Sequence, residues 1–220
     1  TNSGDLIVVW VDERDGNRDI YAQKISSISG NTAWTPDNGK AIVTESSDQN
    51  VPCIEKCGNK FIITWTDKRT DNGDIYAQLI DENGNLQWTS EIPVCDAPDI
   101  QNKSKIAESC SSSVIIAWMD SRSGGYDIYA SRVDSTGTIK WTSVVNNNSS
   151  YQYYPEIITD EADGAFITWL DYYNMDFNIY SQHIDKHGQQ LWESTGLSIV
   201  TADNIQNNQL IVSDQSGGFF

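Results

Sequence analysis

The chain has 220 residues, enough for one domain with a buried core, and its 31 acidic and 14 basic residues give a formal net charge of −17. This acidity argues against binding to nucleic acid or anionic membranes, because both need a basic surface. No apolar run approaches the ~20 residues of a membrane-spanning helix, so we expect no membrane insertion. The composition suits a solvated protein, and we expect an extracellular or cell-surface location.

The tryptophans reveal an internal repeat. The first set is Trp10, Trp65, Trp118 and Trp169, and the second set is Trp34, Trp88, Trp141 and Trp192. Successive members of the first set are 55, 53 and 51 residues apart, and each is followed 23 or 24 residues later by a member of the second. A repeat of roughly 50 residues that reads as strands is typical of a solenoid or a propeller.

Each repeat predicts four short strands in chain order. The first is a weakly apolar stretch, as at 52–55 or 155–159. The second is rich in β-branched residues and ends at the first tryptophan. The third carries the motif Asp-Ile-Tyr-Ala-Gln, whose residues alternate between two faces, as at 74–80. The fourth begins at the second tryptophan and continues through segments such as 41–44. Clusters of Asn, Asp and Gly separate the strands.

Four antiparallel strands per repeat predict an all-β fold, a β-propeller of four-stranded antiparallel blades. We expect repeats at about 1–48, 49–100, 101–151 and 152–204, with the start of a fifth at 205–220. A tandem array of small sandwiches is the weaker alternative, because an immunoglobulin-like unit needs about seven strands.

The end of the sequence bears on the number of blades. Residues 217–220 match residues 164–167, the start of a second strand. We therefore expect the chain to be a segment of a longer protein, with a ring of about six to eight blades. The alternative is a four-bladed ring in which residues 208–213 join the N-terminal strands.

The repeat also resembles a known group of proteins. The pattern Trp-x-Asp-x-Arg-x-Gly-x-x-Asp-Ile-Tyr-Ala-Gln, followed by Asp-x-x-Gly-x-x-x-Trp, resembles propeller repeats of large bacterial surface and secreted proteins, many of them Bacteroidota proteins exported by type IX secretion. The turn at 81–88 loosely resembles the Asp-box of sialidase-like propellers, although the leading Ser/Thr is missing. The resemblance covers essentially the whole chain and implies a fold and an extracellular address more than a chemistry.

An Asp-x-Arg…Asp motif lies between the second and third strands of three repeats. Its members are Asp12, Arg14 and Asp19; Asp67, Arg69 and Asp74; and Asp120, Arg122 and Asp127. Repetition favours a structural role, in which a guanidinium held by two aspartates closes each hairpin. The alternative is an arginine cluster like that of sialidases, but nothing marks the catalytic set that such an enzyme needs.

The same turns are rich in oxygen ligands. Calcium takes about six to eight oxygens, and the candidate ligands are Asp12, Asp15, Asp19, Asp67, Asp71 and Asp74. Neither turn matches an EF-hand loop, so solvated carboxylates are the simpler interpretation. Calcium is the one cofactor that we consider.

The four cysteines are Cys53, Cys57, Cys95 and Cys110. Their spacing fits no zinc site, and no nucleophile signature surrounds them. Burial in the core and disulfide bonds within or between the second and third repeats both stay open.

The fourth repeat departs from the pattern, because Tyr173 stands where the other repeats have arginine. The neighbouring turn and the connection into the repeat should emerge at one face, where they would gather Tyr151, Tyr153, Tyr154, Tyr172, Tyr173, Asp176 and Phe177. Aromatic rings beside polar groups are suited to gripping a sugar or a protein loop. The alternative is that Tyr153 or Tyr173 fills the space left by the arginine.

These patterns predict a non-catalytic binding, adhesion or scaffold module of a larger secreted or cell-surface protein, with a glycan or a protein as its ligand. The alternative is an enzyme, a propeller fragment of a sialidase-like glycoside hydrolase or lyase. A pair of carboxylates in a central pocket would favour the enzyme.

Overall fold

The computed structural model describes residues 4–70, 72–109 and 112–214. Within those ranges it forms β-strands in four sheets and contains no helix, hence none that could cross a membrane. The first sheet comprises β1 (Leu6–Asp12), β2 (Asp19–Ile25) and β3 (Lys40–Val43). The second comprises β4 (Gln49–Cys57), β5 (Lys60–Asp67), β6 (Asp74–Ile80) and β7 (Ile92–Cys95). The third comprises β8 (Gln101–Ser109), β9 (Ser113–Asp120), β10 (Asp127–Asp134) and β11 (Ile139–Asn146). The fourth comprises β12 (Tyr151–Thr159), β13 (Ala165–Tyr173), β14 (Asp176–Ile184) and β15 (Leu197–Val200).

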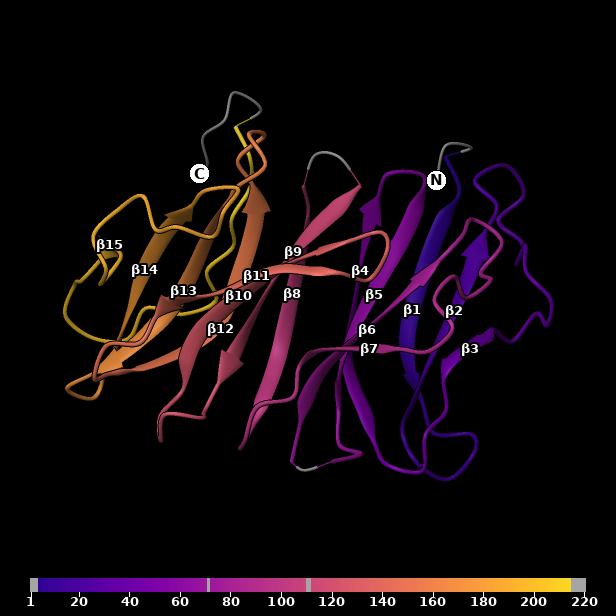
Figure 1. Ribbon diagram of the computed structural model, residues 1–220, viewed down its shortest axis with the longest axis horizontal. Coiled ribbons are helices and arrows are strands. Elements are labelled where there is room, and N and C mark those ends of the chain that lie inside the picture. Colours follow the sequence, from indigo (N-terminus) through magenta and orange to yellow (C-terminus); the bar gives the residue numbers. More distant parts are fainter. Residues whose placement is uncertain (1–3, 71, 110–111, 215–220) are drawn as a thin grey trace.

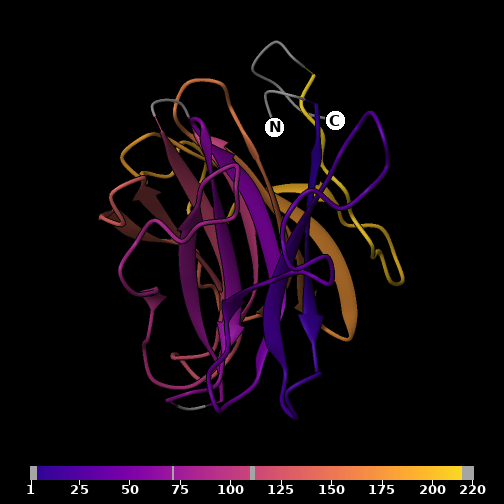
Figure 2. The same cartoon turned by 90° about the vertical axis from the view of Figure 1, so that its right-hand side faces the viewer.

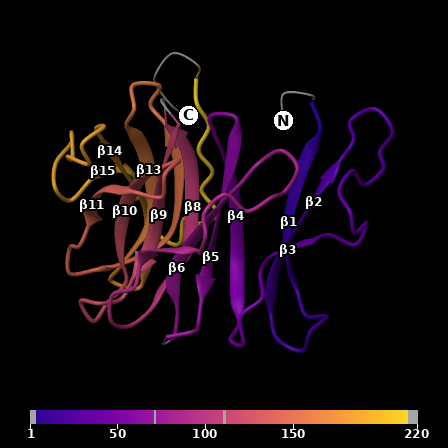
Figure 3. The ribbon, with the colours of Figure 1, turned by 45° about the vertical axis from the view of Figure 1, so that its right-hand side comes forward.

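The four sheets stand side by side in chain order, each an antiparallel meander (Figure 1). Seen from the side, the strand axes are roughly aligned, while neighbouring strands of a sheet alternate in direction (Figure 2). Strands β1, β4, β8 and β12 are edge strands, and each contacts the next one in this series (Figure 3). They therefore form the inner edge of the arrangement. The prediction of an all-β propeller built from four-stranded blades is confirmed, while the number of blades in a closed ring stays a prediction.

The core lies between the sheets, because a four-stranded sheet cannot cover its own two faces. Trp65, Trp118 and Trp169 are fully buried there. Between the third and fourth sheets, for example, Ile115 and Met119 share a cluster with Trp169. Trp65 and Trp118 likewise share clusters with residues of the preceding sheet, so these three tryptophans pack between blades.

The second tryptophans join consecutive blades. The indole Nε1 donates to a carbonyl oxygen of the next blade from Trp34 to Glu82 at 3.1 Å, from Trp88 to Ser135 at 3.1 Å and from Trp141 to Lys186 at 2.9 Å. A glycine of the same turn lies against each of these three rings, as Gly84 does against Trp34. The tryptophan thus belongs to the junction between two blades.

One predicted boundary is wrong. The fourth strand of a blade does not generally start at the second tryptophan, since β3, β7 and β15 begin several residues after it and only β11 contains it. In the first, second and fourth blades a short loop therefore separates the tryptophan from the fourth strand.

Each complete inner strand carries a β-bulge near its start. The ladder to the next strand is interrupted there, and Val51, Lys103 and Tyr154 have positive φ angles of 52°, 56° and 54°. Asn208 has the same conformation, at 57°. Bulges redirect side chains, so they decide what the inner edge presents. Residues 217–220, the expected start of a further strand, lie outside the described residues.

Candidate functional site

The Asp-x-Arg motif forms a repeated structural unit in the first three blades. In the third, Asp120 accepts hydrogen bonds from Trp118 Nε1 at 2.9 Å and from Arg122 Nε at 2.8 Å, and the guanidinium lies 4.4 Å from the ring centre of Tyr129. The first and second blades repeat these contacts. The hydrogen bonds from Arg14 and Trp10 hold the pKa of Asp12 well below its ordinary value. Two of the arginines also contact the preceding blade, since Arg69 Nη1 lies 3.7 Å from Glu45 Oε1 and Arg122 Nη2 lies 2.8 Å from Cys95 Sγ.

The second aspartate of the motif does not have the predicted role. Asp19 accepts from Asn17 Nδ2 at 3.1 Å, and Asp127 accepts from the Ser123 hydroxyl. The arginine is instead held between one aspartate and a tyrosine ring. The tyrosine lies two residues after the second aspartate of the motif, and side chains two residues apart in a strand share a face of the sheet. Its ring therefore packs against the guanidinium in place of the second carboxylate.

The fourth blade lacks this unit. Asp171 accepts from Asn148 Nδ2 and Gln152 Nε2, both at 3.2 Å, and the buried Nε1 of Trp169 has no hydrogen-bond partner among the described residues. The side chain of Tyr173 is 59% exposed. Tyr173 therefore does not fill the place of the missing arginine, and the rim of this blade is free to differ.

The aromatic residues of the fourth blade form one cluster around Tyr153. Its ring centre lies 6.3 Å from that of Tyr151, 6.1 Å from Tyr154 and 6.0 Å from Phe177. Tyr172 joins through Phe177, at 4.7 Å. The structure thus brings together five of the seven predicted patch residues. Tyr173 and Asp176 pair at the tip of the β13–β14 hairpin beside them.

Sequence reasoning missed one member, Tyr126, whose ring centre lies 5.5 Å from that of Tyr153. Tyr126 belongs to the third repeat, at the position where the second repeat has Gly73. Its main-chain oxygen accepts from the Gln152 N–H at 2.7 Å, which places it against the start of β12. Comparing this turn position across the repeats would have found it.

A groove of about 650 Å³ opens beside this cluster, and we call it the β12 groove. It is lined by Tyr154, Glu156, Leu170, Phe177, Ile205, Asn207, Asn208, Gln209 and Leu210. Gln209 Nε2 donates to the carbonyl oxygen of Tyr154 at 2.6 Å, which ties the later segment to β12. The groove therefore has aromatic faces, a carboxylate and amide groups within one depression.

Glu156 is the acidic group of the β12 groove. Lys105 Nζ of the neighbouring inner strand lies 2.7 Å from Glu156 Oε1. Cys53 stands at the equivalent place in β4, and its Sγ donates to the Ser104 carbonyl at 3.2 Å. Burial raises the pKa of the Cys53 thiol, and the nearby charge of Lys105 only partly offsets this. Cys53, Lys105 and Glu156 thus occupy equivalent places on the inner strands, each two residues after the left-handed residue of its bulge.

Two further carboxylates, Glu55 and Glu108, lie farther along the inner strands. Burial raises the pKa of Glu55 on β4, and the negative charge of Glu108 on β8 raises it further. Glu55 also lines a shallow depression between β1 and β4, together with Asp5 and Lys56. The sequence analysis named neither glutamate, because their neighbourhood depends on the packing of two blades.

The calcium prediction gains no support from the geometry. The carboxylates of Asp12 and Asp67 are engaged by tryptophan and arginine, and Asp15 accepts from the Tyr21 hydroxyl at 2.9 Å. Asp71 lies outside the described residues. Over residues 4–70, 72–109 and 112–214, no group of three or more His, Cys, Asp or Glu side chains could hold a metal ion.

The cysteines that the structure describes are thiols. Cys57 and Cys95 are buried and Cys53 is half-buried. Cys110 lies outside the described residues. For Cys57 and Cys95 the core alternative holds, since both belong to the apolar cluster between the second and third sheets.

Comparison with solved structures bears on the fold. An endo-arabinase from Bacteroides thetaiotaomicron is 11% identical, covers 100% of this chain and 84% of its own, and has a TM-score of 0.57. A GH43 endo-arabinanase from Bacillus licheniformis is 12% identical, with 92% and 78% coverage and a TM-score of 0.52. No family model matches the chain, and no curated protein matches it. At this identity the likeness establishes the propeller fold.

The comparison also corrects a functional prediction. The sequence predicted a non-catalytic binding, adhesion or scaffold module and no enzyme, whereas the similar propellers are glycoside hydrolases. That prediction is therefore wrong, and the enzyme alternative is favoured. It failed because the repeat motifs of a single sequence indicate a fold and not an activity.

Proposed function

We propose that the protein is a glycoside hydrolase that holds a polysaccharide in the β12 groove. The observation that carries the proposal is the union of Glu156 with the rings of Tyr154 and Phe177 in one groove. Sugar rings stack on aromatic faces, and glycosidic bonds are cleaved between carboxyl groups. The names of the similar propellers, endo-arabinase and endo-arabinanase, make arabinan the first substrate to test.

Glu156 suits one of the two carboxyl roles that glycoside hydrolysis needs. One carboxyl must be protonated to donate to the leaving oxygen, and another must be ionised to act as base or nucleophile. Glu156 pairs with the ammonium of Lys105 at 2.7 Å, which suits the ionised role. Glu55, whose pKa is raised by burial and by the charge of Glu108, lines a different depression, between β1 and β4, so we assign it no role in the β12 groove. We assign Glu156 as the base or nucleophile.

The aromatic cluster would position the chain of sugars. Tyr154 is 52% exposed and lines the groove with Glu156, and Tyr151, which is 45% exposed, adds a second solvent-facing ring to the cluster. Tyr153 packs behind them against Tyr126 and Phe177 and keeps them in place. Met175 at the hairpin tip is 83% exposed and extends this surface.

The experiment is a reducing-end assay on arabinan and a panel of neutral and acidic polysaccharides. Glu156→Gln should lower kcat by at least about a hundredfold, the usual contribution of general acid–base catalysis. Glu13→Gln is the matched control, since Glu13 forms an exposed pair with Arg18 in the first blade. Hydrolysis that survives Glu156→Gln would refute the assignment, and a panel without any hydrolysis would refute the function.

A separate measurement tests the groove. In the inactive Glu156→Gln variant, Tyr154→Ala should weaken the binding of an oligosaccharide substrate by about tenfold, the order expected for loss of one stacking ring. Tyr21→Phe changes a tyrosine of the first blade and should leave binding as it is. Equal binding with and without Tyr154 would place the substrate elsewhere.

The proposal includes a location. A polysaccharide hydrolase meets its substrate outside the cell, and the net charge of −17 suits a solvated surface. We place the protein among secreted or cell-surface propellers of the Bacteroidota type, as the repeat motif implies. Fractionation of the native source, with immunodetection in medium, envelope and cytoplasm, tests this, and a purely cytoplasmic signal would contradict it.

A further inference from the structure

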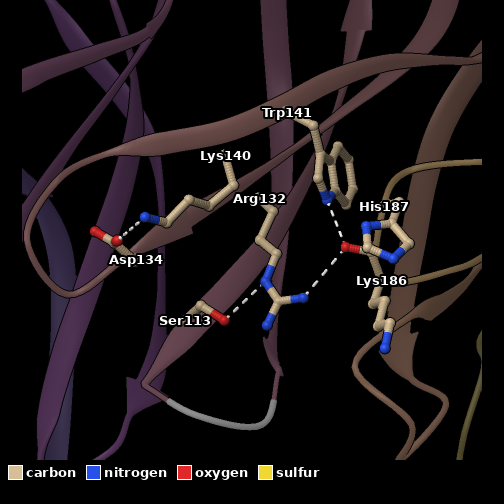
Figure 4. A pocket seen from close by; sticks show the side chains of 7 residues that line it. All are labelled: Ser113, Arg132, Asp134, Lys140, Trp141, Lys186 and His187. Carbon is tan, nitrogen blue, oxygen red and sulfur yellow. Dashed lines mark hydrogen bonds and ion pairs between the residues drawn. The ribbon is translucent and has the colours of Figure 1, made fainter.

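A second depression lies at the junction of the third and fourth blades, and we call it the third junction. It is lined by Ser113, Arg132, Asp134, Lys140, Trp141, Lys186 and His187 (Figure 4). Ser113 and Asp134 pair where β9 starts and β10 ends, whereas the β12 groove lies where β12 starts and β13 ends. The two depressions are therefore at opposite rims of the sheets.

The third junction is unusually basic for this chain. Arg132, Lys140 and Lys186 come together in it, in a protein with only 14 basic residues and a net charge of −17. His187 lies beside them, and Asp134 is the single carboxylate in the lining. Lys140 Nζ lies 2.6 Å from Asp134 Oδ2 at one side of the depression. Arg132 Nη2 also lies 3.3 Å from Asp163 Oδ1, so two carboxylates stand against three cationic side chains and one positive charge is left in excess.

The fold does not require these basic residues, because the same junction occurs twice more without them. The tryptophan hydrogen bond reaches Glu82 at the first junction and Ser135 at the second, and Lys186 only at the third. Where the third repeat has Lys140, the first has Ala33 and the second has Gln87. The hydrogen bond from the tryptophan to the next blade thus forms whether the accepting residue is acidic, neutral or basic.

The tryptophan of the third junction is more accessible than that of the first, as Trp88 of the second junction also is. Trp34 is covered, with 5% of its surface exposed, and Lys40 Nζ lies 5.7 Å from its ring centre. Trp141 is only half-buried and lines the depression. Figure 4 shows its ring between Lys140 and His187, with its Nε1 directed at the Lys186 carbonyl.

The guanidinium of Arg132 is held in place within the third junction by contacts with both blades. Its Nε donates to Ser113 Oγ at 3.0 Å, its Nη1 donates to the Lys186 carbonyl at 3.3 Å, and its Nη2 lies 3.3 Å from Asp163 Oδ1. These contacts join both blades to one guanidinium. The exposed ammonium groups of Lys140 and Lys186 stand at the mouth.

We propose that the third junction is a second binding site, which takes an anionic saccharide of the uronic-acid class. A sugar ring would lie against Trp141, while its carboxylate would be bound by the ammonium groups of Lys140 and Lys186, with the His187 ring beside them. A tryptophan face selects a flat apolar partner, and the two ammonium groups select negative charge. The site is independent of Glu156 and would anchor an acidic glycan at the rim opposite the β12 groove.

The test uses trigalacturonate as the probe, measured by calorimetry on the full chain. The matched ligand is its fully methyl-esterified form, which keeps the rings and removes the charges. We expect trigalacturonate to bind at least about tenfold more tightly than the ester, the order of a charge-assisted hydrogen bond, and to weaken as salt is raised. Equal affinity for the two ligands, or no binding of either, would overturn the proposal.

Matched substitutions locate the site. Lys140→Gln and Lys186→Gln should each weaken trigalacturonate binding by about tenfold. Lys40→Gln removes the same charge beside Trp34 at the first junction and should change nothing. Glu156→Gln should also bind normally, which separates this site from the proposed catalytic groove. A loss with Lys40→Gln equal to that with Lys140→Gln would show only a general charge effect and would refute the site.

Discussion

Trp118 and Asp120 lie two residues apart on one face of β9, and the indole Nε1 donates to the buried carboxylate at 2.9 Å. The first and second blades contain the same pair, Trp10 with Asp12 and Trp65 with Asp67. In the fourth blade the bond is missing, since Asp171 is engaged by Asn148 and Gln152. The blade that has lost this bond is the one that carries the aromatic cluster and the β12 groove.

The contrast between Trp118 and Trp169 makes the first prediction. Both rings are fully buried, so Trp→Phe should cost similar packing at each, but Trp118→Phe should cost roughly 1–3 kcal/mol more because it takes a donor from buried Asp120. Trp118→Ala should cost about 3–5 kcal/mol. Urea unfolding measures each difference, and equal losses at the two positions would show that the indole hydrogen bond contributes nothing.

The contact between Gly84 and Trp34 gives the second prediction. An added Cβ at Gly84 would lie 2.9 Å from the Trp34 ring, and φ is +72°. Gly30 has nearly the same φ, +70°, but open space around it. Gly84→Ala should therefore lower the free energy of unfolding by about 1–3 kcal/mol more than Gly30→Ala, the range for overpacking. Similar melting temperatures for the two variants would mean that the blade junction yields easily.

The pair of Lys140 and Asp134 predicts a pH dependence. Burial raises the pKa of Asp134, but hydrogen bonds from Lys140, Thr136 and the main chain outweigh it and lower the pKa to about 2 from 3.8. Because the pKa of Asp134 is lower in the native protein than in the unfolded chain, its carboxylate stabilises the native protein when the pH is above the unfolded-state pKa. This stabilisation is lost as the pH falls toward 2. Lys140→Gln should therefore cost up to about 1 kcal/mol above pH 5 and little near pH 2, since the pair is partly exposed.

A double substitution controls that experiment. In an Asp134→Asn background, Lys140→Gln should change the free energy of unfolding very little at any pH. A pH-independent cost in both backgrounds would mean that Lys140 acts through packing of its aliphatic part.

The thiol of Cys57 gives the fourth prediction. Its side chain is 1% exposed, and burial raises its pKa to about 11. The thiolate is the reactive form, so iodoacetamide at pH 8 should leave Cys57 unmodified in the native protein and modify it in urea. Mass spectrometry of peptides from both samples checks this. Rapid native labelling at Cys57 would show that the second and third blades separate easily.

The sequence determined the architecture because its signals are local and repeated. Tryptophan spacing, strand alternation and turn residues each recur in every repeat, and a sheet with two apolar faces must pack against neighbours on both sides. The approach of Tyr151, Tyr153 and Tyr154 to Tyr172 and Phe177 also followed from the order of strands, because a turn and a connection at the same end of one sheet are neighbours. The place of the arginine motif between the second and third strands also followed from its repetition.

Only the tertiary structure decided what lies across blades. The charge of Glu108 acts on Glu55, Lys105 forms an ion pair with Glu156, and Trp141 donates a hydrogen bond to Lys186, and each pair comes from different repeats. At the bulge in β12, Tyr154 has a left-handed backbone conformation that redirects the side chains around it, and no turn motif in the sequence marks this position. Local propensity specifies each blade, whereas the inner edge and the junctions arise where separate blades bury their faces against each other, and the proposed chemistry lies there.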